Sequence, residues 1–131
     1  MRIAVLGVGS IGGVVLGARS DSQIDLLAVA RGQTAKNLSD IGLILHTPEG
    51  SIEMIPSERF IIVDSETPLS ESIQSSCDVA LICGKAASTP VLAQLAEEML
   101  TSDGLAISLQ NGLGNSEILV NRIGRDRVLG G

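Results

Sequence analysis

The sequence predicts an α/β fold in which a mostly parallel β-sheet carries helices on both faces and a β-hairpin is inserted. Short apolar runs without polar alternation recur along the chain, which is typical of strands buried on both faces of a sheet. Segments whose apolar residues have helical spacing separate these runs. The chain has 131 residues, within the range of one domain, so we expect a single domain over residues 1–131.

The first elements form a strand–helix–strand unit. Residues 3–6 are apolar and predict a strand that stops at Gly7. Residues 10–19 predict a helix whose first turn lies against a group of glycines, and residues 25–30 predict the second strand. The unit is about 30 residues long, as expected for two parallel strands joined by a helix.

The rest of the chain continues this alternation after one interruption. Residues 43–47 and 51–55 flank a Pro-Glu-Gly turn, which predicts a β-hairpin that projects from the main sheet. Residues 65–76 are rich in Ser and Glu and predict a surface loop or a short helix. The remaining expected elements are helices at residues 33–40, 89–100 and 115–123, strands at residues 60–64, 78–83 and 105–109, and the start of a strand at residues 127–129.

Composition and charge exclude several classes of function. Hydrophobic residues make up 44% of the chain and charged residues 18%, as in a packed globular protein. A single Phe, no Tyr, no Trp and a net charge of −6 disfavour binding to nucleic acid. No stretch reaches the roughly 20 apolar residues of a membrane-spanning helix, and no signal-like segment precedes the first strand. We therefore expect a cytoplasmic protein with neither a nucleic-acid nor a membrane partner.

The two cysteines do not suggest a redox or metal site. Cys77 and Cys83 lack the CxxC spacing of such motifs. They begin and end one apolar run, and a disulfide across a single extended strand is geometrically unfavourable. We expect both to be reduced and expect no metal.

Three polar or glycine-rich segments fall at the carboxyl ends of predicted strands. They are residues 7–12, residues 84–85 and residues 110–114. Ligands of parallel sheets bind outside these ends of the strands. We therefore expect the three segments to converge on one crevice.

The first of these segments has the spacing Gly-x-Gly-x-x-Gly. A dinucleotide pyrophosphate needs backbone N–H donors, a helix N-terminus and no Cβ atoms in its path. Here the turn follows a strand, opens a helix and lies within a strand–helix–strand unit, which is the context that the motif requires. A flexible turn without a ligand is the alternative. The sequence thus predicts a Rossmann-type dinucleotide site contacted by Gly7, Val8, Gly9, Ser10, Ile11 and Gly12.

Residues after later strands indicate the cofactor. Arg31 lies 19 residues after Gly12, where an NAD site would place an acid, and its guanidinium can pair with a 2′-phosphate, which favours NADP(H). Lys85 follows a buried strand, which places it near the ribose or the nicotinamide. Asn111 can bridge cofactor and substrate, or simply cap the next helix. The alternative for both cations is a solvated strand end, and we interpret His46 as a surface residue of the hairpin.

These motifs together resemble the ketopantoate reductase (2-dehydropantoate 2-reductase) family. Residues 7–32 look like the opening of the family, and residues 43–55 look like its hairpin. Residues 84–85 are similar to its lysine after a hydrophobic strand, and residues 110–114 to its Gln/His-Asn-Gly block. The resemblance spans the whole chain because the four motifs occur in the family's order and spacing.

The resemblance implies an NADPH-dependent reduction of a 2-oxo acid to a 2-hydroxy acid. Ketopantoate, on the route to pantothenate, is the first candidate for this small-molecule substrate. The resemblance also implies that residues 7–12 and Arg31 hold NADPH, that Lys85 contacts the cofactor, and that Asn111 touches both cofactor and substrate. The nicotinamide would carry the hydride while the protein supplies orientation and charge.

One departure from the family limits this expectation. The family's proton-donating lysine and most of its substrate contacts lie in a helical C-terminal domain, which we expect to be absent from this chain. We therefore expect no catalytic residue here and no turnover by the chain alone. Cys83 and Gly84 also differ from the residues more usual before the family's lysine. The alternatives are a non-catalytic nucleotide-binding or self-associating protein, such as a homodimer, and a paralogue that acts on another 2-oxo acid.

Overall fold

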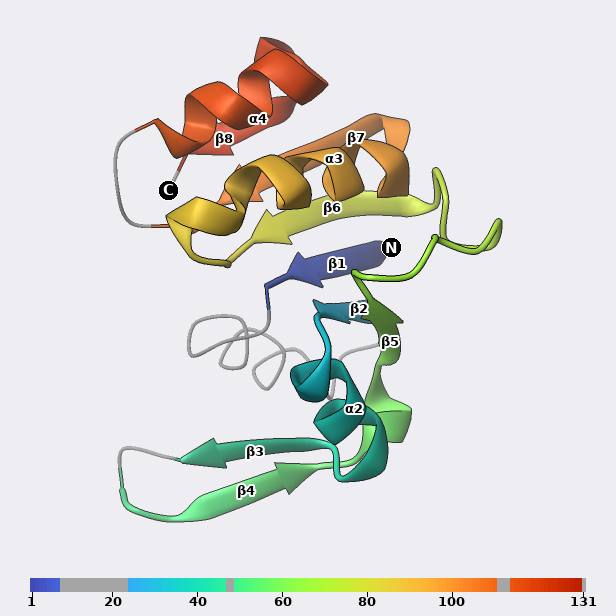
Figure 1. The fold of residues 1–131 in the computed structure, drawn as a ribbon, viewed down its shortest axis with the longest axis vertical. Coiled ribbons are helices and arrows are strands. Elements are labelled where there is room, and N and C mark those ends of the chain that lie inside the picture. The colour runs from blue at the N-terminus through green and yellow to red at the C-terminus, as the bar shows by residue number, and fades with distance from the viewer. Residues whose placement is uncertain (8–23, 47–48, 111–113, 131) are drawn as a thin grey trace.

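The computed structural model of the chain describes residues 1–7, 24–46, 49–110 and 114–130. A parallel sheet in the order β5-β2-β1-β6-β7-β8 forms its centre (Figure 1). The chain runs outward from β1 on one side and then crosses to β6 on the other, as in a Rossmann sheet. The predicted fold class is confirmed. The strands of this sheet are β1 (Arg2–Leu6), β2 (Asp25–Ala30), β5 (Ile61–Asp64), β6 (Cys77–Ile82), β7 (Leu100–Ser108) and β8 (Val128–Gly130).

β1 lies in the middle of the sheet and is buried on both faces. Ala4, Val5 and Leu6 each have 0% exposure. Because successive side chains of a strand point to opposite faces, Ala4 and Leu6 join one hydrophobic core and Val5 joins the other. Burial on both faces explains why this run carries no polar alternation.

Helices cover both faces of the sheet. α2 (Gln33–Asp40) packs on the Val5 face, and α3 (Thr89–Met99) and α4 (Asn115–Ile123) pack on the opposite face (Figure 1). α2 ends where Gly42, at φ +93°, donates its N–H to the Leu38 carbonyl, a conformation that glycine adopts readily at helix ends. The predicted bounds of α2 and α4 are confirmed.

The predicted hairpin is present and stands apart from the main sheet (Figure 1). β3 (Leu43–His46) and β4 (Ile52–Ile55) pair antiparallel as a separate two-stranded sheet. Three short 3-10 helices complete the described elements: η1 (Ser57–Arg59), η2 (Ala86–Ser88) and η3 (Arg125–Arg127). No helix within the described residues is long and apolar enough to cross a membrane.

Several expected boundaries differ from the structure, and one expected helix cannot be compared. β7 begins at Leu100 rather than at residue 105, because Leu100 pairs with Cys77. The register shifts between Cys77 and Val79, so that residues 101–104 also lie within the strand. α3 consequently ends at Met99. β6 likewise spans Cys77–Ile82 rather than residues 78–83. The predicted helix at residues 10–19 lies outside the described residues.

The segment at residues 65–76 forms turns rather than a helix. Ile73 is buried and joins the core on the α3 face, so the segment is held at one point despite its polar composition. Cys77 and Cys83 are both free, as expected for the two ends of one strand.

Candidate cofactor-binding site

The carboxyl ends of the central strands meet at one edge of the sheet. Leu6, the last residue of β1, pairs with Val29 on one side and with Ile82 on the other, and Ile82 in turn pairs with Ser108. The strand order reverses between β1 and β6, and ligands of open α/β sheets bind at this switch point. Gly7, after β1, and Gly84, near the end of β6, therefore flank the position where a ligand is expected.

Gly7 and Gly84 approach each other closely. The Gly7 N–H donates to the Val29 carbonyl at 3.0 Å, and Gly7 has φ +88°, a conformation that glycine adopts without strain. A Cβ atom on Gly7 would lie 2.5 Å from both the Cα and the N of Gly84. A Cβ atom on Gly84 would lie 2.5 Å from Cδ1 of Leu92. The backbone contact excludes a Cβ atom at Gly7, whereas a Cβ atom at Gly84 would require the Leu92 side chain to move. Backbone rather than side chains therefore lies at the switch point.

This backbone surface fits a dinucleotide pyrophosphate, which needs glycines where the chain passes its phosphates. Gly7 is the one residue of the predicted turn that the structure describes. The other five lie outside the described residues: Val8, Gly9, Ser10, Ile11 and Gly12.

Arg31 follows β2 directly and is exposed. Its position at the carboxyl edge, beside β1, places the cation on the side of the sheet where the ribose of a bound dinucleotide is expected. Within the described part of the chain, no ion pair joins Arg31 to a carboxylate.

A carboxylate that sequence reasoning did not single out lies next to the Arg31 loop. β5 pairs with β2, and the Ser65 N–H donates to the Ala30 carbonyl at 2.8 Å. This pairing brings Glu66 so close that a Cβ atom on Gly32 would lie 3.4 Å from its Oε1. The sequence signal for Glu66 is weak, since only the strand order shows that the end of β5 adjoins the end of β2.

Lys85 is exposed and lies directly after Gly84, at the same edge of the sheet. Its carbonyl accepts a hydrogen bond from the Ser88 N–H at 2.9 Å, which begins the short helix η2. Asn111, the other predicted contact, lies outside the described residues.

A buried amide joins the segments that follow β6 and β7. Gln110 is 7% exposed, and its Nε2 donates to the Gly84 carbonyl at 2.8 Å and to the Thr89 Oγ1 at 2.8 Å. The same Nε2 lies 3.4 Å from the Lys85 carbonyl. The sequence places Gln110 in the third segment but indicates no role for its side chain, because its partners are 21 to 26 residues away along the chain.

The convergence of the three segments is therefore visible in the described residues. Gly7 contacts Gly84, and Gly84 is hydrogen-bonded to Gln110.

Cys83, beside Gly84, is half-buried, and this burial raises the pKa of its thiol to about 11. At neutral pH the thiol stays protonated, so it does not supply a nucleophile to the site.

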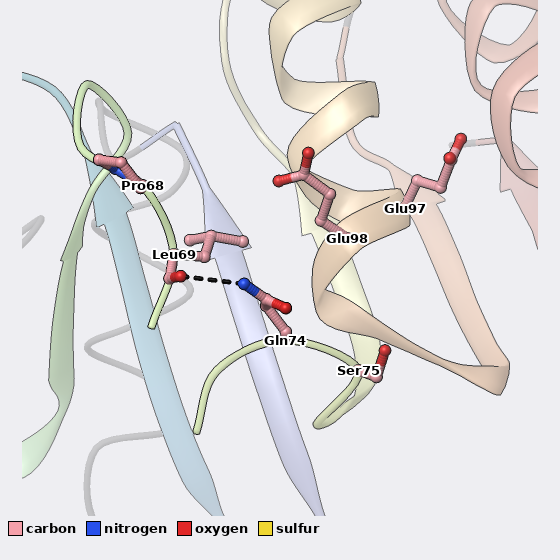
Figure 2. A pocket seen from close by; sticks show the side chains of 6 residues that line it. All are labelled: Pro68, Leu69, Gln74, Ser75, Glu97 and Glu98. Atoms are coloured by element: carbon pink, nitrogen blue, oxygen red, sulfur yellow. Dashed lines mark hydrogen bonds between the residues drawn. The ribbon is translucent and has the colours of Figure 1, made fainter. Parts of the chain in front are cut away.

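A separate hollow of about 500 Å³ lies elsewhere (Figure 2). It adjoins the segment before β6, where the Ser75 N–H donates to the Glu98 carbonyl at 2.9 Å, and so it belongs to the amino end of the sheet. Its lining includes the carboxylates of Glu97 and Glu98, which would repel phosphates. It is lined by Pro68, Leu69, Gln74, Ser75, Glu97 and Glu98 (Figure 2).

A family model described as ketopantoate reductase PanE/ApbA matches residues 3–131. The chain belongs to this family. The expected resemblance is confirmed, and it covers nearly every residue of the chain.

Individual relatives agree with the family match. A 2-dehydropantoate 2-reductase of Halobacterium salinarum is 28% identical over 137 residues, covering 100% of this chain and 41% of that protein. The "uncharacterized oxidoreductase YkpB" of Bacillus subtilis is 27% identical over 131 residues, covering 100% of this chain and 40% of that protein. The chain thus spans about two fifths of the length of these curated relatives.

A structure of D-mandelate dehydrogenase with NADH and anilino(oxo)acetate has the same fold. It superposes with a TM-score of 0.84 at 18% sequence identity, over 100% of this chain and 40% of that chain. The likeness supports the Rossmann-type assignment of the sheet. The NADH and the anilino(oxo)acetate are ligands of D-mandelate dehydrogenase.

Proposed function

We propose that this chain is the NADPH-binding domain of an oxidoreductase that reduces a 2-oxo acid to a 2-hydroxy acid. The observation that carries the proposal is the contact of Gly7 with the Gly84 backbone at the switch point of the sheet, where Gly7 must lack a Cβ atom. Membership of the ketopantoate reductase PanE/ApbA family supports the same conclusion.

Each predicted contact has a distinct role in this proposal. The turn at residues 7–12 offers backbone N–H groups to the pyrophosphate, and Arg31 pairs with the 2′-phosphate of the adenosine ribose. Lys85 binds near the ribose or the nicotinamide, and Asn111 bridges cofactor and substrate. The nicotinamide, when bound, supplies the hydride, while these residues fix its orientation.

Ketopantoate is the substrate that we propose first, with pantoate as the product. A second 2-oxo acid is also a candidate, because the structure of D-mandelate dehydrogenase, which has the same fold, contains anilino(oxo)acetate. Since the chain spans about 40% of its curated relatives, we further propose that it binds the cofactor but does not turn over substrate by itself. Measurable oxidation of NADPH by the 131-residue chain with ketopantoate would contradict that second point.

Cofactor preference is the direct test of the proposal. Titration of the chain with NADPH and with NADH, followed by nicotinamide fluorescence, should give tighter binding of NADPH. A charge-assisted contact to the 2′-phosphate contributes roughly 1.5–3 kcal/mol, so Arg31→Ala should weaken NADPH about 10- to 100-fold and NADH much less.

A matched control removes an arginine far from the site. Arg125 is exposed in η3, next to β8, which is at the edge of the sheet and separated from β2 by three strands. Arg125→Ala changes the net charge as Arg31→Ala does and should leave both affinities unchanged. Equal loss of NADPH affinity in the two variants would remove the role given to Arg31.

A further inference from the structure

We infer that Gln110 is a positioning residue of the cofactor site, because its side-chain amide holds the Gly84–Lys85 peptide in the place from which Lys85 reaches the cofactor. This inference rests on the proposed function and deepens it. Gln110, at 7% exposure, would act through the Gly84 and Lys85 carbonyls rather than by a contact of its own with the cofactor.

The hydrogen bonds of Gln110 fix the orientation of its amide. The carbonyls of Gly84 and Lys85 can only accept, so the group that faces them must be a donor. The Gln110 Nε2 satisfies this requirement, and its Oε1 accepts from the Ser108 Oγ at 3.3 Å. A flipped amide would place Oε1 against the carbonyl oxygens of Gly84 and Lys85, which cannot donate.

The same amide organises the start of two helices. Thr89, at the beginning of α3, accepts from the Gln110 Nε2 and donates its hydroxyl proton to the Asn115 Oδ1 at 3.0 Å, at the beginning of α4. Thr89 is 0% exposed and Asn115 4% exposed. Hydrogen bonds in such buried surroundings are strong, and a lost partner there is costly.

Two candidate cofactor contacts, Gly7 and Lys85, adjoin the peptide that this side chain holds. Gly84, which Gln110 holds through its carbonyl, is the residue against which Gly7 packs. The exposed Lys85 side chain emerges from the same peptide. Asn111 follows Gln110 directly in the chain. Gln110 is therefore placed to set the position of cofactor contacts from a site where it is itself buried.

Two substitutions of Gln110 test whether the N–H donor of its side chain matters, or only the volume of the side chain. Gln110→Glu keeps the shape but presents a carboxylate to the carbonyls of Gly84 and Lys85. Gln110→His keeps a ring N–H donor, which can restore the bond to Gly84. Gln94, exposed on α3, offers a matched control, since Gln94→Glu makes the same change of charge at the surface.

A double-mutant cycle with Lys85 tests whether Gln110 acts through that residue. NADPH dissociation constants are measured for Gln110→Glu and Lys85→Ala singly and together, with circular dichroism to confirm folding. Gln110→Glu should weaken NADPH about tenfold in the wild-type background and about threefold or less in the Lys85→Ala background. Gln110→His should stay within about threefold of wild type, and Gln94→Glu should not change the affinity.

The outcomes distinguish this inference from the proposed function. The positioning role would be overturned if Gln110→Glu weakened NADPH binding by the same factor in the wild-type and Lys85→Ala backgrounds. It would also be overturned if Gln110→His bound NADPH as weakly as Gln110→Glu does. If Gln110→Glu does not fold, the cycle is run with Thr89→Val, which removes an acceptor of the same amide, and additive effects there would overturn the inference equally. Failure of the wild-type chain to bind either NADPH or NADH would instead overturn the proposed function, and this inference with it.

Discussion

Replacing Gly7 by alanine tests the contact that the site is built on. The new Cβ atom would lie 2.5 Å from the Cα and the N of Gly84, well inside the roughly 3.5–4.0 Å at which carbon atoms pack favourably. The neighbour is backbone, so it cannot rotate away. Gly7 also has φ +88°, a conformation that is unfavourable for alanine.

The two contributions can be separated by a control at Gly50. Gly50 has φ +84°, and no described atom lies within 4 Å of a Cβ built there. Gly50→Ala therefore carries only the conformational strain, roughly 1–2 kcal/mol. Gly7→Ala adds the steric overlap, which typically costs roughly 1–3 kcal/mol. We expect Gly7→Ala to lower the free energy of unfolding by about 2–5 kcal/mol, more than Gly50→Ala.

Urea unfolding followed by circular dichroism measures the free energy of unfolding of each variant. An NADPH titration at low urea measures the affinity of the site for the cofactor. Gly7→Ala should lose NADPH affinity even where it remains folded, because separating β1 from the β6 segment moves the glycine turn. Gly50→Ala should bind NADPH as wild type does. Equal destabilisation by the two substitutions, together with unchanged NADPH affinity in Gly7→Ala, would refute the close contact with Gly84 and its role.

Three further predictions concern charge, a partly buried cation and a thiol. Glu66→Gln removes a carboxylate beside Gly32 and should tighten NADPH roughly threefold more than NADH in parallel titrations. Arg127 donates to two carbonyls of β7 at 2.7 and 2.8 Å, so Arg127→Ala should lower the free energy of unfolding in urea by roughly 2–3 kcal/mol, and Arg127→Lys by less. Burial raises the pKa of the Cys83 thiol to about 11, so iodoacetamide should label it slowly at pH 8 and faster as the pH approaches 11. Because this pKa is higher in the folded state, stability should also fall as the pH rises from about 9 toward 11.

The elements that the sequence alone determined are those with a local physical signal. β2 and α2 occur at the predicted residues because burial on both faces and helical spacing are properties of neighbouring residues. α4 likewise ends before Gly124, whose φ of +116° stops the helix. The candidate site was also proposed from sequence, since glycines at a strand end and cations after later strands form a linear pattern.

Tertiary structure alone decided which of these residues meet and what supports them. The early start of β7 depends on the pairing of Leu100 with Cys77, and Glu66 reaches Gly32 because β5 lies beside β2. The bond from Gln110 to Gly84 links residues 26 positions apart. A burial pattern or a turn is encoded within a few residues of chain, whereas the partner of a buried donor, or of a missing Cβ atom, is set by which strands are neighbours in the sheet.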